Sequence, residues 1–176
     1  MSPILGAILL GFVQGVTEFL PISSSGHLVL IQHFVEVQGD DLAFDLVLHL
    51  GTLIPVIVVF REDLIKMLRD PFVGTEPFWQ RPGVRWLWLV GLASVPTAIM
   101  GVALEDLFES MFSGPLSLAW QFAVTAASLQ WSARVQAGNK KVEDMTSAQA
   151  LLIGIAQGIA ILPAISRSGS TIVAAL

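Results

Sequence analysis

Three stretches of the chain are apolar over the length of a bilayer span. Residues 86–104 and 115–133 contain no Asp, Glu, Lys or Arg, and residues 42–60 are apolar apart from Asp45 and His49 near their start. A transmembrane helix needs about 20 consecutive, mainly apolar residues. The pattern therefore predicts transmembrane helices at 42–60, 86–104 and 115–133.

Two further apolar segments, 1–35 and 149–176, are interrupted by polar turns at residues 21–27 and 163–170. Each apolar arm is shorter than a full span. A broken helix at membrane depth is tolerated only where it is buried in protein or lines a wet cavity. We therefore predict two re-entrant helix–loop–helix hairpins at 1–35 and 149–176.

The two hairpins also form an internal repeat with an offset of 143 residues. Three predicted spans lie between the copies, an odd number, so the second copy is inverted. Inverted repeats with broken helices build intramembrane sites in transporters; the alternative is two unrelated apolar helices. The matching positions are Gly11, Gln14, Gly15, Ser23, Ser25 and Gly26 in the first copy and Gly154, Gln157, Gly158, Ser166, Ser168 and Gly169 in the second.

These elements predict a single all-α, polytopic membrane domain over residues 1–176. The second repeat stops just after its hairpin turn, so we expect the chain to be a truncated, N-terminal part of a longer protein. The glycine pairs of the repeat, four residues apart on one helix face, permit close helix contact and need no chemical role.

Basic residues are confined to two of the polar connections. Residues 61–85 and 134–141 carry Lys and Arg, whereas residues 36–41 and 105–114 carry only acidic charge. The positive-inside rule places the first two connections in the cytoplasm and the last two outside. Three helices crossing in alternation satisfy all four assignments.

The composition agrees with a membrane protein. Hydrophobic residues make up 54% of the chain, charged residues 13%, and the mean hydropathy is +0.74. A soluble domain carries about 25% charged residues. The net charge of −5 without a long basic run excludes nucleic acid as a partner, and the absence of cysteine excludes disulfides and thiolate metal sites.

Ionisable and hydroxyl side chains gather at the first break. Gln14 and Glu18 are four residues apart and share a helix face. A carboxylate at membrane depth costs about 2.5–3.5 kcal/mol and indicates function, unless it lies solvated at the headgroup interface. Ser24 offers a hydroxyl, and His27 can act as a general base or nucleophile. The further substrate-binding candidates here are Gln14, Ser23, Ser25 and Gly26.

The second break carries a cation. Arg167 is the only basic residue between positions 142 and 176. Its guanidinium matches phosphate oxygens bidentately and stays charged, whereas the alternative is an arginine that reaches the interface. The first hairpin thus carries the acid–base and nucleophilic groups, and the second hairpin carries the cation. The substrate-binding candidates beside Arg167 are Ser166, Ser168 and Gly169.

These two breaks resemble the two motifs of the undecaprenyl-diphosphate phosphatase, or bacitracin-resistance, family. Gln14 stands where many members have Glu, and Ala164 stands where the family usually has Gly. The family segments are matched, in order along the chain, by residues 14–27, 44–52, 144–146 and 165–169.

The resemblance implies hydrolysis of undecaprenyl diphosphate to undecaprenyl phosphate and inorganic phosphate, which recycles the cell-wall lipid carrier and confers bacitracin resistance. It also implies a divalent cation, Mg²⁺ or Ca²⁺, for which Glu18 is the candidate ligand. The site is expected to face the external side of the inner (plasma) membrane. The expected partners are a polyprenyl diphosphate and membrane lipids; a homodimer is left open.

Two mechanisms fit these residues. In one, Ser24 attacks the terminal phosphorus and His27 takes its proton; in the other, His27 attacks and Ser24 binds phosphate. Arg167 clamps the diphosphate in both, and Glu18 orients His27 or holds the cation. The alternatives are a transporter or lipid flippase, which the inverted repeat also suits, and an inactive fragment of the phosphatase.

Overall fold

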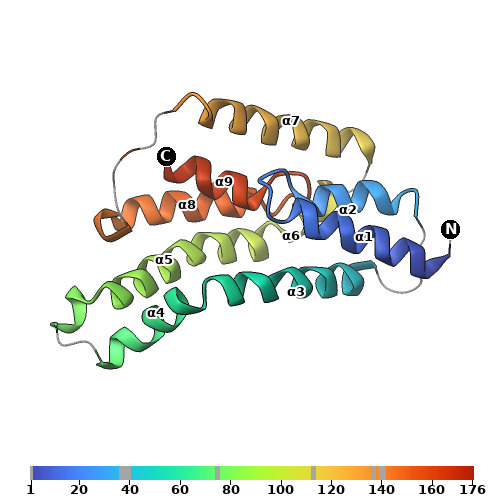
Figure 1. The fold of residues 1–176 in the computed structure, drawn as a ribbon. Helices are drawn as coiled ribbons and strands as arrows, with labels where there is room; N and C mark the ends of the chain where they lie inside the picture. The colour runs from blue at the N-terminus through green and yellow to red at the C-terminus, as the bar shows by residue number, and fades with distance from the viewer. Residues whose placement is uncertain (1, 36–40, 74–75, 112–113, 136–137, 139–141) are drawn as a thin grey trace.

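The structure is a computed structural model that describes residues 2–35, 41–73, 76–111, 114–135, 138 and 142–176. The described residues form helices and no strand, which confirms the predicted all-α class (Figure 1). The predicted connection at 36–40 and the basic pair Lys140 and Lys141 lie outside the described residues. The helices are α1 (Pro3–Thr17), α2 (Ser24–Gln32), α3 (Asp41–Val59), α4 (Arg61–Val73), α5 (Pro82–Ala103), α6 (Glu105–Met111), α7 (Pro115–Ser132), α8 (Ser147–Ile159) and α9 (Arg167–Ala175), with short 3₁₀ turns η1 (Phe78–Gln80) and η2 (Val142–Asp144).

Helices cover the three predicted spans. Helices α3 and α7 lie within a residue of the predicted bounds, whereas α5 begins earlier because Pro82 is at its N-terminus and the Asp70 side chain accepts the Gly83 N–H at 2.7 Å. Among the described helices, α5 is long and apolar enough to cross a membrane; α3 and α4 meet that test as a pair bent by 74°. Helix α7 forms as expected but does not meet it.

Two predicted connections contain helices that sequence reasoning missed. Helix α4 occupies the basic connection after α3, and its first turn carries Glu62 and Asp63, which stabilise a helix N-terminus. Helix α6 occupies the acidic connection after α5 and buries Phe108 against the second hairpin. Their polar composition predicted only connections between spans; α6 is held through the buried Phe108, whereas no described residue of α4 is buried.

The two broken segments share their local structure. Helix α2 shifted by 143 residues has the bounds of α9, the same offset that relates the two sequence repeats. Each of these helices starts with the same N-cap: Ser23 Oγ accepts the Gly26 N–H at 3.4 Å, and Ser166 Oγ accepts the Gly169 N–H at 3.0 Å. The repeated serine and glycine therefore encode the restart of the helix after each break.

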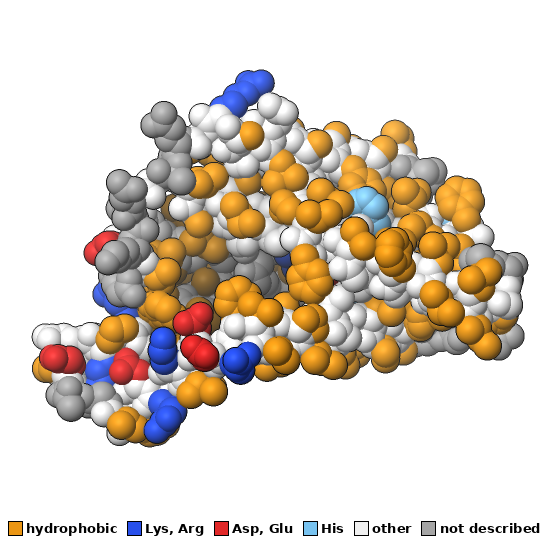
Figure 2. All heavy atoms as spheres, viewed as in Figure 1, with side chains coloured by type: hydrophobic (Ala, Val, Ile, Leu, Met, Phe, Trp, Pro, Cys, Tyr) orange, Lys and Arg blue, Asp and Glu red, His pale blue; other side chains and the backbone are white. Residues whose placement is uncertain are grey.

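Polar side chains are buried while large apolar side chains are exposed. Gln14 is 1% exposed and Gln121 0%, whereas Phe34 is 81% exposed and Val102 80%. In Figure 2 hydrophobic side chains are spread over the whole face, and most of the charged ones gather around α4. Apolar patches of this extent are rare on soluble proteins, so the distribution suits a lipid surrounding.

Helix α8 packs closely against α5 through its glycine pair. A Cβ on Gly154 would lie 2.0 Å from the Ala93 carbonyl oxygen, and one on Gly158 would lie 2.6 Å from Met100 Sδ. The corresponding pair on α1 is different: a Cβ on Gly15 meets no atom within 4 Å, and one on Gly11 meets only the end of a leucine side chain at 3.8 Å. Both glycine pairs permit close helix contact, but of the two only the pair on α8 makes it.

This difference predicts opposite effects of one substitution. Gly154→Ala forces a methyl group against the α5 backbone and should lower the free energy of unfolding by about 1–3 kcal/mol. Gly15→Ala, the matched control, should be neutral or stabilising by up to about 1 kcal/mol, because alanine has the higher helix propensity. Thermal unfolding of the detergent-solubilised variants measures both. Equal melting temperatures for the two variants would contradict the α5–α8 packing.

Candidate functional site

The two polar turns meet. Ser23 Oγ donates to the Pro163 carbonyl oxygen at 2.5 Å, and Ser25 Oγ donates to the same oxygen at 3.1 Å. Glycine is needed at position 26, because a Cβ there would lie 2.8 Å from Ala164 Cα and 2.8 Å from the end of the Phe122 ring. The turns that are 140 residues apart in sequence therefore form one structural unit.

Helix α7 holds the second turn in place. Thr125 Oγ1 donates to the Ala164 carbonyl at 2.8 Å and accepts the Ser166 N–H at 3.1 Å. Gln121 Oε1 accepts the Ala164 N–H at 3.0 Å. All these groups are buried, and every backbone polar group they bond would otherwise be unsatisfied. Ala164 has no positive φ, so alanine fits where the resembled family usually has glycine.

The first turn contains a strained residue. Ser23 has φ 68°, the one non-glycine residue with positive φ in the described part of the chain. Its carbonyl accepts the His27 backbone N–H at 3.3 Å and the His27 Nδ1–H at 2.7 Å. These two bonds to one carbonyl hold the turn in a conformation that serine adopts only under constraint.

The predicted contact between His27 and Ser24 is not made. Its Nδ1 bonds back to Ser23, four residues earlier, and its ring packs edge-on against Phe122 of α7 with centroids 5.0 Å apart. It is not among the residues that line the groove described below. The hydrogen bond from Nδ1 to the Ser23 carbonyl commits the imidazole to its own turn rather than to the Ser24 hydroxyl.

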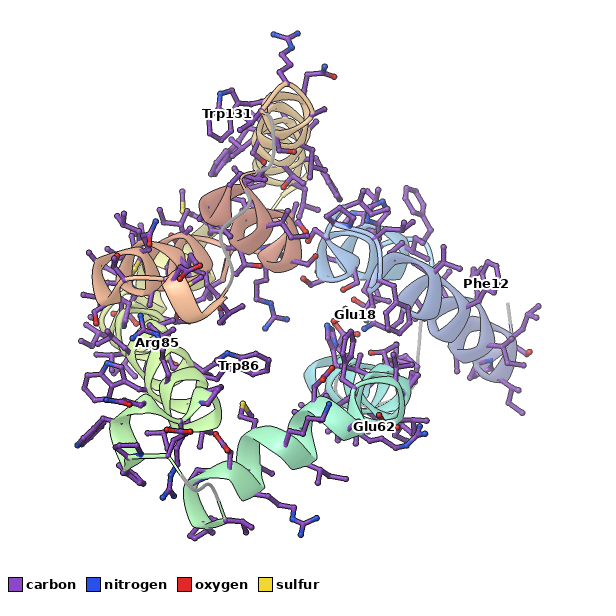
Figure 3. All side chains as sticks on the ribbon, turned by 60° about the vertical axis from the view of Figure 1, so that its left-hand side comes forward. Phe12, Glu18, Glu62, Arg85, Trp86 and Trp131 are labelled. Atoms are coloured by element: carbon purple, nitrogen blue, oxygen red, sulfur yellow. The ribbon has the colours of Figure 1, made fainter. Side chains whose placement is uncertain are left out.

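Glu18 receives the Ser24 hydroxyl instead. Ser24 Oγ donates a short hydrogen bond to Glu18 Oε2, and Gln14 Nε2 donates to the same oxygen at 3.0 Å. Gln14 Nε2 also donates to Thr52 Oγ1 of α3 at 3.3 Å. Glu18 lies where the end of α1 approaches α3 (Figure 3). A carboxylate bonded to a serine hydroxyl can accept its proton when the oxygen attacks an electrophile.

Arg167 is the unpaired cation of the site. It is the first residue of α9, and its exposed side chain makes no hydrogen bond or ion pair with the described residues. It lines the same small pocket of about 50 Å³ as Glu18 and Ser24. Ser166 and Ser168 lie beside it, with their hydroxyl oxygens 3.2 Å apart. An unpaired guanidinium next to hydroxyl groups is a site for an anion such as phosphate.

A larger groove of about 730 Å³ opens from this pocket. Glu18 and Arg167 line its polar part together with Ser168. Apolar side chains, mainly from α3, line much of the remainder. The polar end and the apolar walls match an amphiphile with a phosphate headgroup. The apolar lining residues are Val29, Leu46, Leu50, Leu53, Val56 and Ile161.

The structure brings most of the predicted residues together. Gln14, Gly26 and Gly169 support the site rather than line it, and His27 lies outside the lining. The predicted residues that do line the pocket or the groove are Glu18, Ser23, Ser24, Ser25, Ser166, Arg167 and Ser168.

Sequence reasoning missed the polar residues that α3 and the second hairpin add to the groove. Asp45 and His49 were visible as the two polar interruptions of an apolar span, four residues apart and so on one face. That spacing was the signal that both side chains line the same groove. The missed polar lining residues are Asp45, His49, Thr52, Gln157 and Thr171.

Comparison with known proteins shows the family to which the chain belongs. The family model of the bacitracin resistance protein BacA matches residues 7–176. This chain belongs to the BacA family. It is 43% identical to an undecaprenyl-diphosphatase of Methanosphaera stadtmanae, 42% to one of Carboxydothermus hydrogenoformans and 44% to one of Halothermothrix orenii. The alignments cover 96–100% of this chain but 61–67% of those relatives.

The resemblance to the BacA family implies a divalent cation at this site. No group of three His, Cys, Asp or Glu side chains among the described residues could hold a metal ion. Gln14 turns its N–H₂ end, not its carbonyl oxygen, toward Glu18. Glu18 already accepts two donors, and one carboxylate is by itself fewer oxygen ligands than Mg²⁺ or Ca²⁺ takes.

The α7 contacts give a prediction about the second turn. Thr125→Val keeps the shape of the side chain but leaves the Ala164 carbonyl and the Ser166 N–H unsatisfied, at about 1–3 kcal/mol for each group. The melting temperature should fall, and the Ser166 amide should exchange with solvent faster. Ser128→Ala is the control, because Ser128 bonds only a carbonyl of its own helix. A Thr125→Val variant as stable as Ser128→Ala would refute the role of α7.

Proposed function

We propose that this chain carries the site of an integral-membrane phosphatase that hydrolyses undecaprenyl diphosphate to undecaprenyl phosphate and inorganic phosphate. The three relatives compared above are named undecaprenyl-diphosphatase. The observation that carries the proposal is the Ser24 hydroxyl bonded to Glu18, in one pocket with the unpaired Arg167. A nucleophile, a base and a cation are what transfer of a phosphoryl group needs.

The shape of the groove supports a lipid substrate. The diphosphate would lie at the polar end, against Arg167 and the Ser166 and Ser168 hydroxyls. The prenyl chain would extend along the apolar residues of α3. A soluble phosphate ester has no apolar chain to bury against this wall. A prenyl chain does, and it gains about 25 cal/mol for each Å² of apolar area removed from water.

The reaction proceeds in two steps at Ser24. Its oxygen attacks the terminal phosphorus while its proton passes to Glu18, and the bond to the bridging oxygen breaks to release undecaprenyl phosphate. Water then attacks the phosphoserine, Glu18 returns a proton to the serine oxygen, and inorganic phosphate leaves. Arg167 neutralises the charge on the phosphoryl oxygens in both steps.

His27 supports this site as a structural group. Its Nδ1 donates to the Ser23 carbonyl and so helps to hold the turn that presents Ser24. The variant in which His27 attacks phosphorus would require the ring to leave this bond and its contact with Phe122. The geometry therefore favours Ser24 as the nucleophile.

The setting of the site in the membrane is part of the proposal. The two helix–turn–helix units would be re-entrant hairpins related by an inverted repeat in a multi-pass protein of the inner (plasma) membrane, with the site open to the external side. The shared bounds of α2 and α9 and the apolar outer surface support this arrangement. The enzyme would recycle the cell-wall lipid carrier and confer bacitracin resistance. A required Mg²⁺ or Ca²⁺ would have to arrive on the diphosphate.

Phosphate release from a prenyl diphosphate by the purified chain tests the proposal. Ser24→Ala should abolish turnover. Arg167→Lys keeps the charge but loses the planar fork and should lose most activity, while Arg167→Ala should lose about 10²–10³-fold or more. Arg61→Lys is the control, because among the described residues Arg61 pairs with Glu62 and donates to the Val58 carbonyl at the end of α3, away from the pocket.

Near-wild-type turnover by the Arg167→Lys variant would remove the bidentate contact from the mechanism. A wild-type chain that binds prenyl diphosphate but releases no phosphate would overturn the phosphatase assignment itself.

A further inference from the structure

A histidine other than His27 stands at the reacting end of the groove. His49 lies on α3, and its Nε2 is 3.8 Å from Glu18 Oε2. This separation is within reach of an ion pair but is longer than a direct hydrogen bond. The carboxylate that accepts the Ser24 hydroxyl therefore faces an imidazole from a different helix.

The His49 ring is fixed by its own helix. Its Nδ1 lies 2.7 Å from the Asp45 carbonyl oxygen, which accepts only, so Nδ1 carries a hydrogen and donates it. The Asp45 side chain in turn accepts a hydrogen bond from Gln32 of α2 at 2.7 Å. With Nδ1 donating to Asp45, the opposite nitrogen, Nε2, faces Glu18, and it can donate to that carboxylate when the ring carries a hydrogen on both nitrogens.

His49 Nε2 has no other partner. It is buried and makes no hydrogen bond with any described residue. A buried nitrogen left without a partner costs about 1–3 kcal/mol, so it is rarely kept without a function. The charged group that Nε2 approaches is the carboxylate of Glu18, at 3.8 Å.

We propose that His49 is a positioning residue that holds Glu18 from the α3 side in the orientation that accepts the Ser24 proton. Gln14 and Ser24 restrain the same oxygen, but both belong to the first hairpin, so His49 alone ties the carboxylate to α3 directly. A base oriented by a third group recurs in nucleophilic catalysis. The inference rests on the proposed function and adds a residue that neither polar turn contains.

The kinetic test compares two substitutions of His49 with a control. His49→Leu should lower kcat for a short-chain prenyl diphosphate by about 10- to 100-fold with little change in KM, because the base is misplaced while the phosphate contacts remain. His49→Gln should recover most of kcat, since a glutamine amide can place an N–H group near the position of Nε2. His33→Leu, at the exposed end of α2, should match the wild-type chain.

A His49→Gln variant as slow as His49→Leu, or a His49→Leu variant with normal kcat, would overturn the positioning role. A rise in KM with unchanged kcat would also overturn it, because His49 would then bind substrate rather than orient the base.

A double-mutant cycle separates this inference from the proposed function. His49→Leu and Glu18→Gln are combined, and thermal and denaturant unfolding give the unfolding equilibrium constant of each variant in detergent. Interacting side chains should give effects that differ from additivity by about 2- to 100-fold. If the effects of the two substitutions are non-additive in a chain that has no phosphatase activity, the His49–Glu18 contact is supported and the proposed function is wrong. Additive effects would reject the contact whatever the activity.

Discussion

Two serine hydroxyls of the first turn share one carbonyl oxygen of the second turn, that of Pro163. This contact joins segments from opposite ends of the chain and brings the Ser24–Glu18 pair into one pocket with Arg167. It is possible because Gly26 has no side chain where Ala164 and Phe122 approach. A methyl group at that position would separate Arg167 from Ser24 without altering any residue that lines the pocket.

The polar groups that make this contact are buried within a protein whose outer surface is apolar. In lipid, a broken helix is tolerated only when protein groups satisfy the freed backbone. Thr125 and Gln121 do this for the second turn, and the His27 ring does it for the Ser23 carbonyl in the first. The side chains that permit the breaks are thus distinct from those that would perform the chemistry, and loss of either set would abolish function for different reasons.

Much of the fold could be predicted from the chain because its signals are local. The apolar runs indicated α3, α5 and α7, and the repeated Ser and Gly positions marked where α2 and α9 begin. The expectation that Glu18, Ser24 and Arg167 share one pocket followed from their place at the two breaks, whereas the hydrogen bond between Glu18 and Ser24 was not predicted. The direction of a side chain is set by tertiary contacts and could not be predicted. His27 was expected to take the Ser24 proton, but its ring bonds the Ser23 carbonyl, and the Ser24 hydroxyl donates to Glu18, which His49 approaches from α3.

The identity of the phosphorylated residue tests the account most directly. The purified chain would be mixed with a prenyl diphosphate labelled at its terminal phosphorus, quenched during turnover, digested, and analysed by mass spectrometry under conditions that preserve both phosphoserine and phosphohistidine. The account predicts label on Ser24, lost in Ser24→Ala, because this hydroxyl is the one bonded to the Glu18 carboxylate. Label on His27 or His49 would contradict it, since both imidazoles are assigned here to holding other groups in place.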